Sequence, residues 1–251
     1  MYSGIVKKLI FPSLFMVQCI LTIAQVPESF NYQVILPGKT RSDSHKWEER
    51  DIIENQILYN GRVWRNLYSR VRGNQFLFTE MFMPGTVSVS GKLFTGLELK
   101  YDIYNDELLI RSAQGIILQL NKEMVDGFTI EYNKRKYDFQ KLEVNTDGPG
   151  EGYFNILYKG KSELLVKYKK GIQLLAVDDT YDLFNQYNRI YLNKDGEMHL
   201  INKKKNIINL FSGTNKDIMR FIKSRRLKVT RKDPDSFIPL VVFCDNLIDG
   251  N

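Results

Sequence analysis

The densest concentration of reactive side chains in this sequence is a basic cluster near its C-terminal end. Residues 203–232 contain eleven lysines and arginines and the single acid Asp217, so the segment carries a net charge of +10. A charge of this density attracts anionic partners, and the attraction weakens as salt is added. The residues predicted to bind such a partner are Lys203, Lys204, Lys205, Lys216, Arg220, Lys223, Arg225 and Arg226.

Two interpretations of this cluster compete. A solvated helix face carries charge without any partner, and it is the simpler explanation. Against it stands the asymmetry of the chain, because the rest of the predicted mature protein has a net charge of −5. The basic segment therefore predicts docking on lipopolysaccharide, phospholipid headgroups or an acidic protein. Nucleic acid fits less well, because no aromatic side chains that could stack on bases alternate with the basic ones.

Catalytic and metal-binding motifs are incomplete. The sequence has no G-x-S-x-G elbow, and its two histidines, His45 and His199, with Cys244 offer too few ligands for an ordinary zinc site. No cofactor is therefore predicted. Pairs of carboxylates could still support glycoside hydrolysis, although acids beside turns more often bond the backbone. The candidates for such a pair are Asp102, Asp106, Glu107, Asp178, Asp179 and Asp182.

The N-terminus predicts export. Lys7 and Lys8 precede an apolar run over residues 9–24, and small residues at its end predict cleavage between Ala24 and Gln25. A membrane anchor is the alternative, but the run is shorter than the roughly 20 residues of a spanning helix. The expected location is the periplasm or the outer cell envelope, with no transmembrane span after processing and with peripheral membrane contact by the basic segment.

Alternating hydrophobicity predicts a mainly β protein. Residues 97–103, LELKYDI, place apolar and polar side chains on opposite faces, as a half-buried strand does. Short strands separated by turns such as Asn105-Asp106 and Lys194-Asp195-Gly196 indicate an antiparallel meander, built as an open curved sheet or a sandwich. Asn60-Gly61 predicts a further hairpin, or else a loop. The apolar run at 172–177 predicts a central strand.

The pattern changes to a period of about 3.6 after residue 203, which predicts a C-terminal pair or trio of helices. Thr214 with Asp217 predicts a capping box for the second helix, and Asp233-Pro234 opens a third. The predicted organisation is a signal peptide (1–24), a polar segment (25–54), an antiparallel β domain (55–202) and basic helices packed on it (203–251). A glycine-rich loop or subdomain junction falls at 147–152.

Three segments are similar to a group of exported, β-rich proteins of Bacteroidota. They are YDIYNDELLI (101–110), YFNILYKGKSELLVKYKK (153–170) and NIINLFSGTNKDIMRFIKSRRLKV (206–229). The resemblance extends over most of the chain from about Tyr59. It implies export and a β meander with C-terminal helices, and it implies no activity, ligand or catalytic residue.

The sequence thus predicts an exported, non-catalytic envelope protein that acts as a binding or structural module and docks anionic material through its basic helices. The alternative is a carrier of an apolar ligand or lipid, because a curved sheet closed by amphipathic helices can enclose a cavity. A carboxylate-dependent hydrolase is the third hypothesis.

Overall fold

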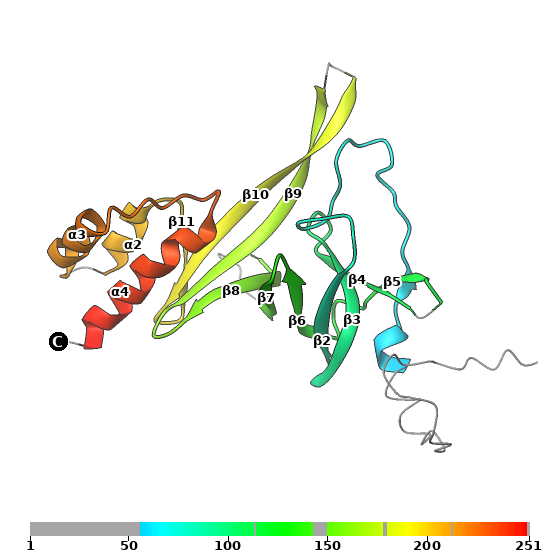
Figure 1. Ribbon diagram of the computed structural model, residues 1–251, viewed down its shortest axis with the longest axis horizontal. Coiled ribbons are helices and arrows are strands. Elements are labelled where there is room, and N and C mark those ends of the chain that lie inside the picture. Colours follow the sequence, from blue (N-terminus) through cyan, green and yellow to red (C-terminus); the bar gives the residue numbers. More distant parts are fainter. Residues whose placement is uncertain (1–55, 113, 143–149, 178–179, 212, 250–251) are drawn as a thin grey trace, which may run out of the picture. The chain divides into compact units, whose positions relative to one another are not determined.

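The computed structural model describes residues 56–112, 114–142, 150–177, 180–211 and 213–249 (Figure 1). The predicted signal peptide, its cleavage site at Ala24 and Gln25, and the polar segment 25–54 lie outside the described residues, as do residues 147–149 of the glycine-rich loop at 147–152.

Within the described residues, eleven strands form one open antiparallel sheet in the order β1-β5-β4-β3-β2-β6-β7-β8-β9-β10-β11. The mainly β prediction is therefore confirmed, as an open sheet and not a sandwich. The strands are β1 (Arg62–Val63), β2 (Met83–Val89), β3 (Lys92–Asp102), β4 (Glu107–Arg111), β5 (Ile117–Gln119), β6 (Val125–Tyr132), β7 (Arg135–Leu142), β8 (Gly152–Lys159), β9 (Glu163–Val177), β10 (Tyr181–Lys194) and β11 (Glu197–Ile201).

The sheet departs from a simple meander at β2. This strand pairs with β3 on one side and with β6 on the other, so the chain extends the sheet first in one direction and then in the opposite one. The alternation predicted for β3 is confirmed on its inner face, where Leu99, Tyr101 and Ile103 are buried. Its polar face is also covered: Lys100 is buried with its Nζ 4.5 Å from the ring centres of Phe76 and Phe82.

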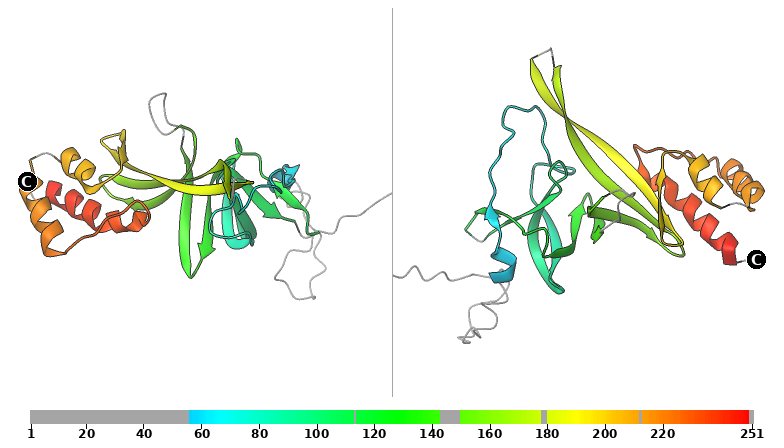
Figure 2. Two further views of the ribbon diagram at one scale, coloured as in Figure 1. Left: turned by 90° about the horizontal axis from the view of Figure 1, so that it is seen from above. Right: turned by 180° about the vertical axis from the view of Figure 1, so that it is seen from behind.

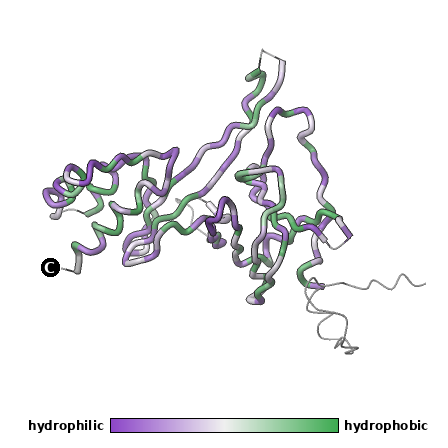
Figure 3. The backbone as a smooth tube through the Cα atoms, viewed as in Figure 1, coloured by the Kyte–Doolittle hydropathy of each residue, from purple (hydrophilic) through white to green (hydrophobic). Residues whose placement is uncertain are grey.

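Two local predictions were wrong. At Asn60-Gly61 the structure has the loop named as the alternative and not a hairpin, because residues 56–59 are helical and β1 pairs with β5. Gly61 serves close packing instead, since a Cβ there would lie 2.2 Å from the carbonyl oxygen of Gln119. Residues 172–177 are not central either. They form the outer end of the β9–β10 hairpin, where Leu174 and Leu175 are 73% and 56% exposed (Figure 3).

The helical predictions are confirmed. The elements are α2 (Lys204–Leu210), α3 (Asn215–Ser224), the 3-10 turn η1 (Pro234–Phe237) and α4 (Ile238–Asp249). Thr214 does occupy the N-cap position of α3, but the predicted capping box is absent, because its hydroxyl donates backwards to the carbonyl of Phe211 at 2.9 Å. Figure 2 shows α2, α3 and α4 beside the β8–β11 end of the sheet.

Two polar contacts attach the last helix and its leading turn to the sheet. Arg135 on β7 forms a bidentate ion pair with Asp235 of η1. Asp245 of α4 is 2% exposed, and its carboxylate accepts hydrogen bonds from the backbone N–H and the hydroxyl of Ser162 at 2.9 and 2.8 Å. Because Ser162 lies in the β8–β9 turn, this contact fixes the register of α4 on the sheet.

We expect Asp245→Ala to destabilise the protein by about 2–3 kcal/mol, because it leaves two buried donors on Ser162 without an acceptor. Urea unfolding followed by circular dichroism measures this loss. The control is Asn246→Ala, at an exposed neighbouring position of the same helix, which should change the free energy of unfolding by less than about 0.5 kcal/mol. Equal losses in the two variants would contradict the anchoring role of Asp245.

Candidate functional site

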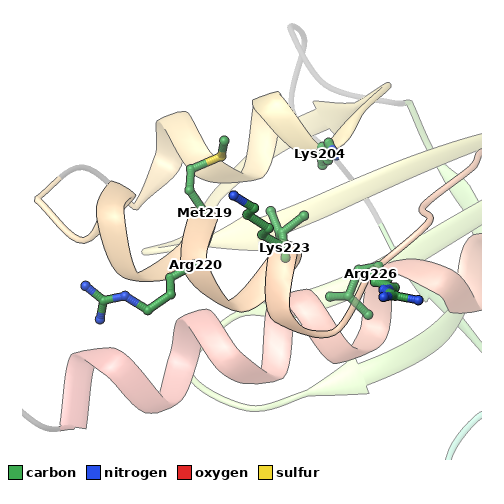
Figure 4. A pocket seen from close by; sticks show the side chains of 7 residues that line it. Lys204, Met219, Arg220, Lys223 and Arg226 are labelled. Atoms are coloured by element: carbon green, nitrogen blue, oxygen red, sulfur yellow. The ribbon is translucent and has the colours of Figure 1, made fainter.

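Four of the predicted basic residues line one surface groove. Lys204 of α2, Arg220 and Lys223 of α3, and Arg226 just beyond α3 surround it, and three apolar side chains complete its lining: Met219, Ile222 and Leu227 (Figure 4). The groove has a volume of about 570 Å³. Met219, Lys223 and Arg226 lie on one side of α3 because residues three, four and seven positions apart share one face of a helix, whereas the Arg220 side chain extends away from them (Figure 4).

The charge of the groove is largely uncompensated. Arg220 contacts the carboxylate of Asp217 at 3.0 Å. Within the part of the chain that the structure describes, no carboxylate lies at ion-pair distance from Lys204, Lys223 or Arg226. Three cations therefore face a surface groove beside exposed apolar carbon, which is the arrangement an anionic amphiphile requires.

The other predicted residues lie outside this groove. Lys203 precedes α2 as its N-cap, where its backbone N–H donates to the side chain of Asn206 at 3.0 Å. Lys205, Lys216 and Arg225 are exposed on the same helical segment but do not line the groove. The structure thus divides the predicted cluster into four residues that line the groove and four that lie outside it.

α3 is held firmly behind the groove. Ile218 and Ile222 are buried, and the ring of Phe221 stacks on Phe243 of α4 with the ring centres 3.9 Å apart. These contacts fix the backbone that carries Arg220 and Lys223. The backbone beneath the groove is therefore in place before any ligand arrives, which lowers the entropy lost on binding.

The acids considered for hydrolysis have other partners. The carboxylate of Asp102 accepts bonds from the backbone N–H groups of Tyr104 and Asn105, both at 3.0 Å, as expected for an acid that shapes a turn. Glu107 pairs with Arg62 at 3.2 Å. Asp182 accepts from the backbone N–H of Leu175, and Asp178 and Asp179 lie outside the described residues.

Asp106 belongs to a polar cluster that the sequence did not indicate. Its Oδ1 accepts from the hydroxyl of Tyr101 at 2.5 Å, and its Oδ2 accepts from Lys122 Nζ at 2.8 Å. Lys167 of β9 is buried nearby and donates to the carbonyl of Glu151 at 2.6 Å. The members come from positions 101 to 167, so sequence spacing could not reveal their proximity.

Burial lowers the pKa of Lys167 to about 8. Asp106 opposes this shift, whereas the neighbouring cations Lys122, Lys169 and Arg189 add to it. Burial of the amine is thus the main cause of the depressed pKa, and the nearby acid offsets it only in part.

Comparison with known proteins returns no relatives: no protein-family model, curated protein or solved structure matches the chain. The resemblance to exported Bacteroidota proteins thus stays a prediction. Among the described residues, no three His, Cys, Asp or Glu side chains gather closely enough to hold a metal ion. Nor does any described helix combine the length and apolarity that crossing a membrane demands.

The pKa of Lys167 predicts a pH dependence of stability. Its folded pKa of about 8 lies below the unfolded value of 10.5, so the unfolded state binds more protons between these values. The contribution of Lys167 to the free energy of unfolding therefore rises with pH across this window, by up to about 3 kcal/mol.

The measurement is the difference in the free energy of unfolding between the natural protein and Lys167→Met at pH 7, 8, 9 and 10. Other titrating groups are common to both proteins and cancel in the difference. We expect the free energy of unfolding of the natural protein to increase relative to that of the variant as the pH rises above 8. A difference that stays flat across the series would show that Lys167 keeps an ordinary pKa.

Proposed function

We propose that this protein is an exported, non-catalytic module of the cell envelope that docks on membrane surfaces rich in anionic phospholipid. The observation that carries the proposal is the groove, in which Lys204, Arg220, Lys223 and Arg226 surround apolar side chains. The N-terminal sequence supports the exported location.

Charge complementarity favours a phosphate-bearing partner. Arginine presents a planar fork that matches two phosphate oxygens, and lysine adds a compact charge that does not require one geometry. Each basic residue close to an anionic membrane contributes about 1 kcal/mol to binding. Four such residues in one groove suffice for reversible attachment without any inserted helix.

The apolar lining favours a lipid over a purely polar anion. Met219 is 53% exposed and lies beside Arg220 on α3, with Ile222 and Leu227 lining the same groove. Methionine is flexible and polarisable, so it adapts to irregular apolar surfaces such as the first methylenes of an acyl chain. A lipid phosphate bound to the cations and an acyl chain packed on Met219 would together occupy the charged and the apolar parts of the groove.

We favour docking over transport of an apolar ligand because the groove is open at the surface and cationic at its rim. Buried side chains fill the space between the sheet and the helices, including Leu164 and Val166 of β9 and Phe237, Leu240 and Val241 of the C-terminal helices. Docking needs no enclosed chamber.

The test is co-sedimentation of the full chain with vesicles of phosphatidylglycerol and phosphatidylcholine, compared with vesicles of phosphatidylcholine alone, across a salt series. We expect binding to the anionic vesicles that falls with salt. The groove variant replaces Lys204, Arg220, Lys223 and Arg226 with Gln, and we expect it to bind at least tenfold more weakly.

A matched control replaces Lys203, Lys205, Lys216 and Arg225 with Gln. It removes the same charge from the same helices but leaves the groove intact, so it should keep most of its affinity at 0.15 M salt, where screening acts over about 8 Å. If the control loses as much as the groove variant, diffuse charge and not the groove attracts the membrane. If neither variant loses affinity, the docking proposal fails.

A further inference from the structure

The outer part of the β9–β10 hairpin extends beyond the other strands and away from the helices (Figure 1), and it presents a second surface. Leu164 and Val166 of β9 enter the main core with the helices, whereas Leu165 and Tyr191 form a separate cluster with Phe154. Because side chains alternate along a strand, residues 167, 169, 171 and 173 share this second face with their partners across β10. We call the outer part of it the shelf: Lys169, Gly171, Gln173, Asn185, Tyr187 and Arg189.

Two cations of the shelf lack a counter-charge. Lys169 is paired in register with Tyr187, and Arg189 lies one step further along the same face, opposite Lys167. The amine of Lys167 is already committed to Glu151. Throughout the described ranges, no carboxylate lies at ion-pair distance from Lys169 or Arg189, so both are available to an external anion.

Tyr187 provides an aromatic platform beside these cations. It is 45% exposed, and its ring covers Gly171, where an added Cβ would lie 3.5 Å from its Cε1. The Arg189 guanidinium lies 5.9 Å from the ring centre. This distance is an ordinary contact, so the ring lies beside the backbone at Gly171 while part of it remains open to solvent.

Paired amides complete the shelf next to this platform. Asn185, opposite Gly171, donates from its amide to Gln173. Both side chains are exposed, and each amide has donor and acceptor capacity beyond this one bond. Along the hairpin, the shelf therefore presents first the cations, then the aromatic ring and then the hydrogen-bonding amides.

We propose that the shelf binds an acidic polysaccharide through its uronic-acid residues. The C–H face of a sugar ring stacks on Tyr187, because the negative face of an aromatic ring attracts such weakly positive hydrogens. Lys169 and Arg189 pair with the sugar carboxylate, and the amides of Gln173 and Asn185 bond its hydroxyls. This inference goes beyond the proposed membrane docking and concerns a different surface.

A lipid surface suits the shelf less well than a glycan. The shelf combines one aromatic ring with polar and charged groups and has no aliphatic lining comparable to Met219, Ile222 and Leu227 in the groove. A saccharide needs few, well-placed polar contacts around one apolar face, which is what Tyr187 and its neighbours supply.

The test is isothermal titration calorimetry of the full chain with an oligogalacturonate, compared with an uncharged malto-oligosaccharide. We expect binding of the acidic sugar that weakens with salt, and at least tenfold weaker binding of the neutral one. Absence of oligogalacturonate binding at millimolar concentration, or equal binding of the two sugars, would overturn the proposal.

Matched tyrosine variants identify the platform. Tyr187→Ala should lose at least tenfold in affinity, and Tyr187→Phe should keep most of it because the ring remains. The control is Tyr181→Ala, since Tyr181 is 43% exposed on the same strand and packs under Arg72. Equal loss in Tyr181→Ala and Tyr187→Ala would contradict the shelf.

Charge variants separate the shelf from the groove. Lys169→Gln with Arg189→Gln should lower affinity at least tenfold and flatten its salt dependence, because the ion pairs with the sugar are gone. The groove variant described above should bind the oligogalacturonate unchanged. If the groove variant loses sugar binding and the shelf variant keeps it, the glycan binds at the helices and this inference is refuted.

Discussion

The half-buried carboxylate of Asp106 holds several strands of the sheet together. Its two oxygens accept from Tyr101 and Lys122, and the backbone at Gly152 approaches so closely that a Cβ there would lie 2.0 Å from Asp106 Oδ2 and 2.6 Å from Lys167 Nζ. Five segments meet at this point: β3, the turn after it, the connection from β5 to β6, the start of β8, and β9 with Lys167. Because a carboxylate withdrawn from water is costly unless it is paired and hydrogen-bonded, these contacts favour the observed arrangement of the five segments.

This arrangement also determines where positive charge remains at the surface. Lys167 directs its amine inward to Glu151, so Lys169 and Arg189 beside it are left without an internal partner. At the helical end, Asp245 and Arg135 fix α4 and η1 against the sheet, and the cations of α3 consequently face outward. Two cationic surfaces result, one lined with aliphatic side chains and one built around an aromatic ring. Their different apolar components are the basis for assigning a lipid to one and a saccharide to the other.

The sequence predicted local structure well and long-range pairing poorly. Alternation identified β3 and its neighbours, and the change of period identified α2 and α3, because both patterns follow from burial of one face. Pairing of β2 with β6 was not predictable, since a strand pattern does not specify which edge it meets. The apolar run at 172–177 led to a wrong prediction of a central strand for a related reason. Apolar residues normally indicate burial, but these residues lie on a hairpin that extends beyond its neighbouring strands. The sequence predicted the basic residues that line the groove. It did not predict the shelf, because Lys169 and Tyr187 lie 18 residues apart on different strands.

We propose that these two surfaces bind different partners independently. Hydrogen exchange of the full chain, measured alone, with phosphatidylglycerol vesicles and with oligogalacturonate, tests this independence. We expect vesicles to slow exchange within residues 204–227 and the oligosaccharide to slow exchange within residues 167–189. Each ligand should leave the other segment unchanged. Protection of the same segment by both ligands, or of neither segment by either ligand, would contradict it.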